Sequence, residues 1–100
     1  MTKQQAEKIL QILVDPRQNL LVLVVKAYKH VYDVWPEIGT LLQDNKYTIL
    51  SFNRANASYR ISDPIGIDKT IRFVADASGD RLNSKLAGYA EGSIVWLYDN

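Results

Sequence analysis

The run Leu20–Val25 holds six apolar residues with no polar residue between them. A strand that faces water on one side alternates apolar and polar residues, so an unbroken run indicates a strand covered on both faces. Such strands lie inside α/β sheets, and we take this run as the centre of the fold. The chain contains a second, nearly continuous apolar run, Ser93–Tyr98, which predicts a strand of the same kind.

Two segments on either side of this central run repeat apolar residues at intervals of three and four, the spacing of one helix face. The first predicted helix begins near Thr2 or Lys3 and ends before Pro16, and the second covers Val31–Leu42. Pro36 lies inside the second helix. Because an interior proline costs about 3 kcal/mol, we expect a kink at Pro36 or a new helix that starts there.

Three further strands are predicted from β-branched and aromatic residues: Tyr47–Phe52, Ser58–Ile61 and Thr70–Val74. The first two form an antiparallel hairpin, because the polar Asn53–Asn56 between them has the composition of a turn. Arg81–Leu86 predicts a short helix. The expected fold is one small α/β domain over residues 1–100, with two main helices and a mixed sheet of about five strands.

The composition excludes several classes of site. With 47% apolar residues, 23% charged residues and a formal net charge of +1, no overall field draws the chain to nucleic acid or to an anionic membrane. Cysteine is absent and His30 is the single histidine, which excludes disulfides, cysteine-ligated metals and multi-histidine metal sites. The first residues lack the apolar core of a signal peptide, and no apolar run approaches the roughly 20 residues that span a bilayer. We expect a cytoplasmic protein without membrane contact.

Two features suggest catalysis or nucleotide binding, and each has a simpler explanation, while the glycine spacing argues against nucleotide binding. Asp99 follows the last apolar strand, where nucleotide-binding sheets hold magnesium, although an aspartate before a turn is common. His30 and Asp33 have the spacing of a base and its orienting acid, but no nucleophile is placed beside them, which favours a solvated helix surface. The five glycines never take the spacing of a phosphate-binding loop, so we expect poor nucleotide affinity.

A group of aromatic and basic residues forms the candidate contact surface. Tyr28, Tyr32 and Trp35 recur near Lys26 and Lys29, a pattern that suits base stacking with phosphate contacts but more often reflects core packing. The scattered arginines are Arg54, Arg60, Arg72 and Arg81. They indicate ordinary surface charge unless the fold gathers them. The candidate contacts to a partner or a nucleic acid are Lys26, Tyr28, Lys29, Tyr32, Arg54 and Arg60.

The order of these elements resembles the ATPase region of phage large-terminase subunits, the motors that package DNA into a procapsid. The resemblance covers almost the whole chain, between the family's phosphate loop and its acidic strand. Thr2–Leu10 resembles the helix after that loop, Leu20–Lys26 the next strand, and Asn53–Ile61 the family's hairpin. Asp80–Leu86 and Ile94–Asn100 resemble the last helix and the acidic strand. The resemblance implies a truncated fold of the P-loop NTPase type.

The positions that this family uses for ATP hydrolysis are altered at both ends. Thr2 falls on the magnesium-binding Ser or Thr, which puts Met1 in place of the essential lysine, and the glycine-rich loop with its strand is missing. Asp99 is followed by Asn100 where the resemblance implies two adjacent acids, and an amide does not act as a general base. Thr2, Asp99 and Asn100 are therefore degenerate positions. We expect no enzyme activity, no metal and no cofactor.

The missing strand suggests a partner, because it leaves Leu20–Val25 or Ser93–Tyr98 with an edge that another chain can pair with. The leading hypothesis is a non-catalytic protein–protein interaction module of phage type, working in the host cytoplasm. It would regulate a packaging motor by occupying a subunit's place. Two alternatives stay open: an excised fragment of a terminase large subunit, with viral DNA packaging as the parent function, and a small nucleic-acid-binding protein.

Overall fold

The computed structural model describes residues 1–76 and 85–98. The helices are α1 (Lys3–Val14) and α2 (His30–Asp44), and a short 3₁₀ turn, η1, spans Glu91–Ser93. The strands are β1 (Leu20–Val25), β2 (Thr48–Asn53), β3 (Ser58–Ser62), β4 (Asp68–Ala75) and β5 (Ile94–Trp96). The elements therefore follow the order that the apolar periodicities predict.

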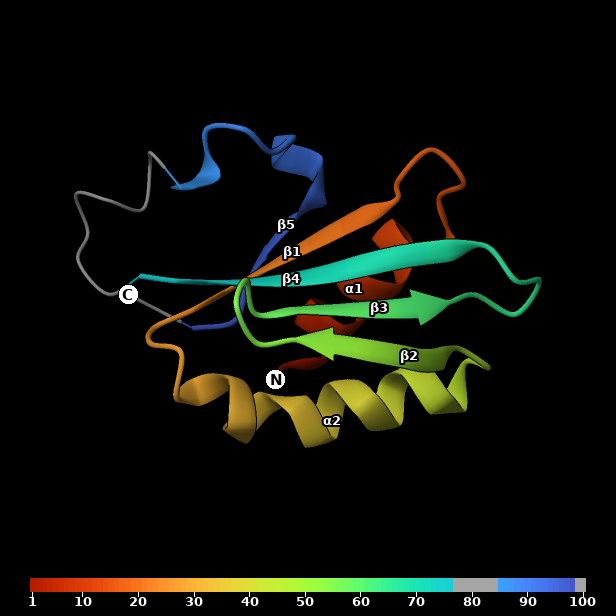
Figure 1. Cartoon of the computed structure of the whole chain (residues 1–100), viewed down its shortest axis with the longest axis horizontal. Coiled ribbons are helices and arrows are strands. Elements are labelled where there is room, and N and C mark those ends of the chain that lie inside the picture. Colours follow the sequence, from red (N-terminus) through yellow and green to blue (C-terminus); the bar gives the residue numbers. More distant parts are fainter. Residues whose placement is uncertain (77–84, 99–100) are drawn as a thin grey trace.

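The five strands form one mixed sheet in the order β2-β3-β4-β1-β5 (Figure 1). β1 is parallel to β4 on one side and to β5 on the other, while β2, β3 and β4 form an antiparallel meander. The predicted small α/β fold, with its mixed five-stranded sheet, two helices and hairpin, is confirmed. Its relationship to the P-loop NTPases stays a prediction.

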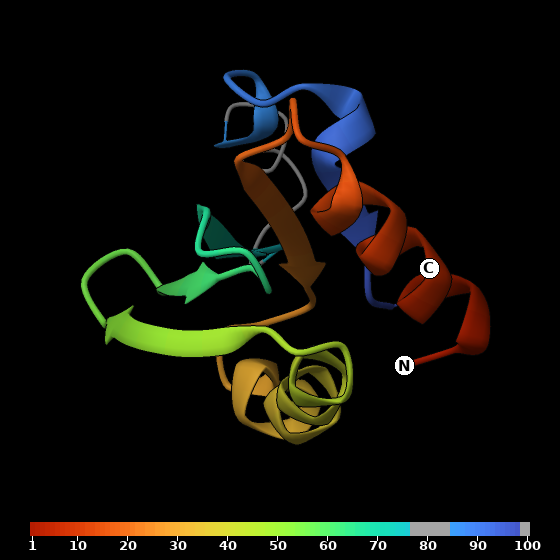
Figure 2. The same cartoon turned by 90° about the vertical axis from the view of Figure 1, so that its right-hand side faces the viewer.

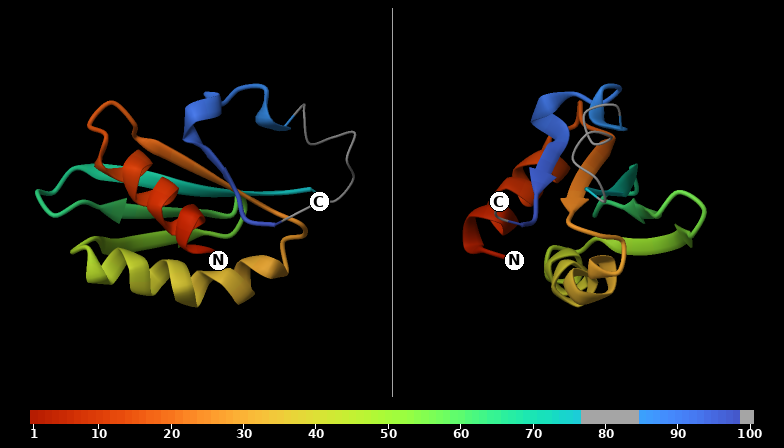
Figure 3. Two further views of the ribbon diagram at one scale, coloured as in Figure 1. Left: turned by 180° about the vertical axis from the view of Figure 1, so that it is seen from behind. Right: turned by 90° about the vertical axis from the view of Figure 1, so that its left-hand side faces the viewer.

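Both helices pack on the same face of the sheet, and α1 lies in front of the strands when the sheet is seen from behind (Figure 3). The core that they share with β1 includes Ile9, Leu13, Leu21, Leu23, Ile38 and Leu42. On the opposite face, Val22 and Val24 are buried against Leu86 and Tyr89. These two residues belong to the segment before β5, drawn in blue in Figure 2. The central strand is thus covered on both faces, as predicted, but a segment near the C-terminus provides the second cover.

Several boundaries differ from the prediction. A new helix at Pro36 is wrong, because α2 is one helix with Pro36 inside it. Pro36 and Tyr32 are both exposed, so water can replace the hydrogen bond that the carbonyl of Tyr32 loses. β5 is shorter than the predicted strand Ser93–Tyr98. Most of the predicted helix Arg81–Leu86 lies outside the described residues, although its last two residues are helical.

The edges of the sheet are β2 and β5. Of the two strands expected to have a free edge, Leu20–Val25 is central, so that alternative is wrong, whereas Ser93–Tyr98 contains the edge strand β5. Part of the β5 edge is covered by α1, because Gln5 Nε2 donates a hydrogen bond to the carbonyl oxygen of Trp96 at 2.9 Å. β2 is the more open edge, with Leu50 and Phe52 exposed. Within residues 1–76 and 85–98, no helix combines the length and apolar content needed to cross a bilayer.

Candidate functional site

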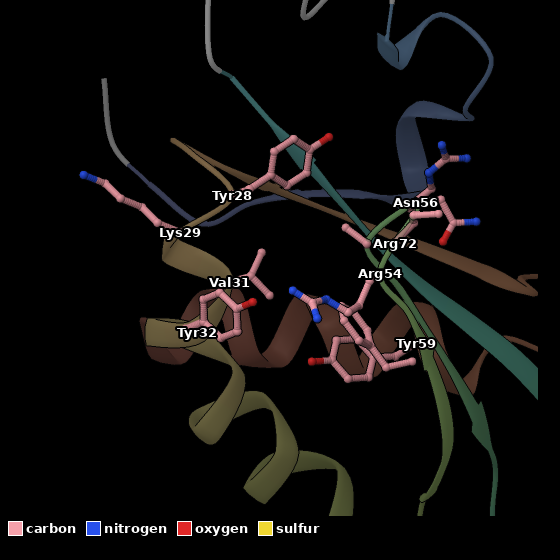
Figure 4. A pocket seen from close by; sticks show the side chains of 11 residues that line it. Tyr28, Lys29, Val31, Tyr32, Arg54, Asn56, Tyr59 and Arg72 are labelled. Carbon is pink, nitrogen blue, oxygen red and sulfur yellow. The ribbon is translucent and has the colours of Figure 1, made fainter.

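A cavity of about 430 Å³ lies between the start of α2 and the tip of the β2–β3 hairpin (Figure 4). Because β3 runs antiparallel to β4, this tip lies at the end of the sheet where β1 and β4 finish. The lining residues are Tyr28, Lys29, Val31, Tyr32, Phe52, Arg54, Ala55, Asn56, Ala57, Tyr59 and Arg72. We call this cavity the hairpin pocket and take it as the candidate site.

Hydrogen bonds within the β2–β3 turn shape one wall of the hairpin pocket. Asn53 Oδ1 accepts a hydrogen bond from the backbone nitrogen of Ala55 at 2.9 Å, and Asn56 Oδ1 accepts one from the Ser58 hydroxyl at 2.6 Å. Asparagine side chains favour such turns, which is why the sequence predicts a turn at this place. The turn positions Arg54 at the pocket.

The turn between β1 and α2 shapes the other wall and carries Tyr28 and Lys29. His30 Nδ1 accepts a hydrogen bond from the backbone nitrogen of Ala27 at 3.2 Å, so this nitrogen of the imidazole closes the turn. No hydrogen bond joins His30 to Asp33 within the described part of the chain. The histidine therefore supports the turn.

Three cations line the hairpin pocket, Lys29, Arg54 and Arg72, and no acid does. Among the described residues none of these three side chains forms an ion pair, whereas Arg60 Nη2 lies 2.9 Å from Asp68 Oδ2. Cations on a concave surface without neutralising acids concentrate positive potential. The lining of the pocket is therefore locally positive although the net charge of the chain is only +1.

The aromatic rings at the pocket form two groups. Trp35 stacks on Tyr59 with ring centroids 3.5 Å apart, and the Phe52 centroid lies 4.4 Å from that of Tyr59. Burial raises the pKa of Tyr59 above its ordinary value. Tyr32 and Tyr28 are 72% and 49% exposed. Core packing is thus confirmed for Trp35, while Tyr28 and Tyr32 present ring surface to solvent.

The fold gathers four of the six predicted contacts in this pocket: Tyr28, Lys29, Tyr32 and Arg54. Lys26 lies outside it, with Nζ 5.1 Å from the ring centroid of Tyr98. Arg60 also lies outside, because it pairs with Thr70, two residues further from the hairpin tip than the pair of Ser58 and Arg72, and its guanidinium binds Asp68. The predicted set is therefore split between three places.

Arg72, Phe52, Tyr59 and Asn56 line the pocket but were not predicted as contacts. Arg72 joins the site because it pairs with Ser58, at the foot of the hairpin tip. That register is set by strands distant in sequence, so no local pattern reveals it. Of the scattered arginines, two are gathered, Arg60 is not, and Arg81 lies outside the described residues.

Of the three degenerate ATPase positions, the structure describes Thr2. Thr2 is the N-cap of α1: its hydroxyl oxygen accepts a hydrogen bond from Gln5 N at 3.1 Å, and Thr2 N donates one to Gln5 Oε1 at 2.7 Å. This hydroxyl therefore stabilises a helix end. Asp99 and Asn100 lie outside the described residues. Within the described ranges, no three His, Cys, Asp or Glu side chains group as metal ligands.

Comparison with known proteins finds no matching family model, no matching curated protein and no matching solved structure. The resemblance to terminase ATPases, the phage setting and the absence of ATP hydrolysis stay predictions from the sequence.

Proposed function

We propose that this chain is a non-catalytic binding module that holds nucleic acid in the hairpin pocket. The proposal rests on one observation, the grouping of three cations with exposed tyrosines in a cavity whose lining contains no acid. Cations bind phosphates through charge, and aromatic ring faces stack on bases. A small net charge is compatible with this role because the cations lie together at one end of the sheet.

Such binding has a characteristic dependence on salt. Each neutralised phosphate releases counterions, so the logarithm of the affinity for a single strand falls by about 0.7 per contact for each unit of log salt concentration. Three contacts therefore give a slope of about −2. A partner held mainly through apolar contacts would show little salt dependence.

The test is fluorescence anisotropy of a labelled oligonucleotide of about 12 nucleotides, a length near one binding site. Affinity is measured for the whole chain from roughly 50 to 200 mM salt. Arg54→Ala and Arg72→Ala should each weaken binding and make the slope shallower by about 0.7. Arg60→Ala is the matched control, because its guanidinium is paired with Asp68 outside the pocket.

Two results would reject the proposal. One is binding by the unmodified chain that does not change with salt, or no binding at the lowest salt. The other is an equal loss of affinity in Arg54→Ala and Arg60→Ala, which would mean that the pocket has no special part.

A second candidate function is protein binding through a sheet edge, the function that the sequence predicts first. The observation in its favour is the edge strand β2, where most side chains are exposed and Leu50 and Phe52 present apolar surface. An extended segment of another chain could add to this edge as a further strand. Whether such a partner is a packaging motor stays a prediction.

Sedimentation velocity over a range of concentrations tests this candidate as self-association. A shift to dimer that persists at high salt and is removed by Leu50→Lys would support it, because the lysine places a charge on the pairing edge. A monomer at the highest concentration would count against self-association through this edge.

A further inference from the structure

We propose that the hairpin pocket takes one unpaired base from a single-stranded nucleic acid that crosses it, an inference that rests on the proposed function. The cavity, at about 430 Å³, lies in the size range of sites for small ligands. In a duplex the bases are stacked and paired, so only the phosphates can approach a concave site. A single strand can turn a base out at little cost, because the base has no partner to leave.

Tyr32 is the ring that receives the base. Its side chain is 72% exposed, and within the described residues no other aromatic ring packs against it. Tyr28 is less available, because Lys85 Nζ already lies 5.8 Å from its ring centroid. Tyr59 is occupied by its stack with Trp35. Stacking on an exposed ring tolerates any base, since every base has a flat face.

The side of the pocket that faces Tyr32 is built from packed aromatic rings. Tyr59 is stacked on Trp35 and is flanked by Phe52, so three rings from α2, β2 and β3 hold one another in place. A wall that is already ordered loses little conformational entropy when a ligand binds. The preformed wall therefore favours entry of a flat group between Tyr32 and the hairpin.

The three cations mark the path of the nucleic-acid backbone across the pocket. Figure 4 shows Arg54 pointing toward Tyr32, while Lys29 and Arg72 point outward on either side of the pocket. A backbone that runs from Lys29 past Arg54 places one phosphate next to the stacked base, and it reaches Arg72 only beyond the hairpin tip, because the Arg72 side chain lies on the opposite face of the sheet. The Arg72 guanidinium lies 5.7 Å from the ring centroid of Tyr89, and a guanidinium that packs on a ring still donates from its edge to a phosphate.

The experiment compares three probes of equal length under one low-salt condition. The probes are a labelled oligothymidine, the same strand with every base replaced by an abasic site, and a duplex of mixed sequence. Each is titrated with the unmodified chain, with Tyr32→Ala and with Tyr32→Phe. Circular dichroism checks that both variants keep the native fold, which we expect because Tyr32 is exposed.

Stacking predicts a specific pattern of affinities. Tyr32→Ala should weaken binding of oligothymidine by about 5- to 100-fold, while Tyr32→Phe, which keeps a ring, should stay within about twofold. The abasic strand should bind the unmodified chain as weakly as oligothymidine binds Tyr32→Ala. For the abasic strand, Tyr32→Ala should cause no further loss, because the base and the ring act as a pair.

The failure of this inference is distinct from the failure of the proposed function. If Tyr32→Ala is neutral, or if duplex and abasic strand bind as tightly as oligothymidine, base stacking is overturned while salt-dependent phosphate binding stands. If the unmodified chain shows no salt-dependent binding to any probe, the proposed function itself is rejected and the stacking inference with it.

Discussion

Two groups of charged residues, at opposite ends of the sheet, have opposite roles. At the end where β1 and β4 begin, Lys69 is only 4% exposed, and its Nζ donates hydrogen bonds to the carbonyl oxygens of Asp15 at 3.0 Å and Gln18 at 2.8 Å. Asp63 Oδ1 accepts two backbone hydrogen bonds in the β3–β4 loop nearby. These charges satisfy backbone groups of the fold itself.

At the other end, the cations of the hairpin pocket have no such partners. Lys29 and Arg54 form no ion pair or side-chain hydrogen bond within the part of the chain that the structure describes, and the pocket lining holds no acid. A charge that satisfies buried backbone contributes to folding, whereas a charge left at a concave surface is available to a ligand. The comparison therefore assigns stability to Lys69 and Asp63 and ligand binding to the cations of the hairpin pocket, while other charged groups at the pocket end, such as Lys85 and Asp76, also stabilise the fold.

The largest expected effect comes from removing Lys69. Lys69→Ala leaves two carbonyl oxygens without their donor and removes a buried aliphatic stem, so the free energy of unfolding should fall by about 3 kcal/mol. Urea denaturation, followed by tryptophan fluorescence, measures the change. Lys29→Ala is the matched control at the opposite end and should change the free energy of unfolding by less than about 0.5 kcal/mol. Equal losses of unfolding free energy in Lys69→Ala and Lys29→Ala would contradict the contrast between these two lysines.

A charge reversal in the pocket should have the converse effect. Arg54→Glu places an acid where a phosphate would lie, so affinity for a single strand should fall at least about tenfold, or about 1.4 kcal/mol. The free energy of unfolding should stay within about 0.5 kcal/mol of that of the unmodified chain, because Arg54 is exposed. A variant that binds normally but has a lower free energy of unfolding would mean that Arg54 stabilises the fold and does not bind the ligand.

Thr2 offers a smaller effect, on stability alone. Thr2→Ala removes the acceptor for Gln5 N at the start of α1, and the loss of an N-cap costs about 1 kcal/mol of unfolding free energy. Thr2→Ser keeps the hydroxyl and should be nearly neutral. Thermal denaturation in buffer with and without magnesium measures both variants. A stabilisation by magnesium that disappears in Thr2→Ala would contradict the capping role and favour the ATPase-like one.

The smallest effect is confined to alkaline pH. Burial, and then the hydrogen bond to Asp76, raises the pKa of Tyr98 to about 12. The phenol of an unfolded chain ionises near pH 10, so this contribution to stability is complete below about pH 10 and is lost as the pH rises toward 12. Tyr98→Phe should flatten the fall in stability over that interval, as measured by urea denaturation at each pH. An unchanged pH profile would contradict the assignment.

Much of the fold is predictable because it depends on local patterns. The unbroken apolar run Leu20–Val25 predicts a strand covered on both faces, and it is the central β1. Asparagine-rich residues 53–56 predict the hairpin turn. Helical periodicity predicts α1 and α2, but it does not say which face of the sheet each helix covers. That choice depends on connections and packing across the whole domain, and both helices lie on one face.

The candidate site is predictable only in part, because it is assembled from distant segments. Tyr28, Lys29 and Tyr32 are close in sequence, so their spacing alone suggests a contact surface. Arg54 and Arg72 join them only through the hairpin and its pairing with β4. Arg60 lies on the same face of the sheet as Arg72, yet it pairs with Thr70, further from the hairpin tip, and its guanidinium binds Asp68. Long-range register, which single residues do not encode, decides between these arginines.

The most direct test of the division between the two ends is a titration of the isotope-labelled chain with a short single strand at low salt, followed by two-dimensional NMR of the backbone amides. The account predicts shifts in two groups, Tyr28–Tyr32 and Phe52–Ala57, that added salt reverses. It predicts little change over Asp15–Asn19 and Asp63–Lys69. Shifts centred on those last two segments, or no shifts at all, would contradict it.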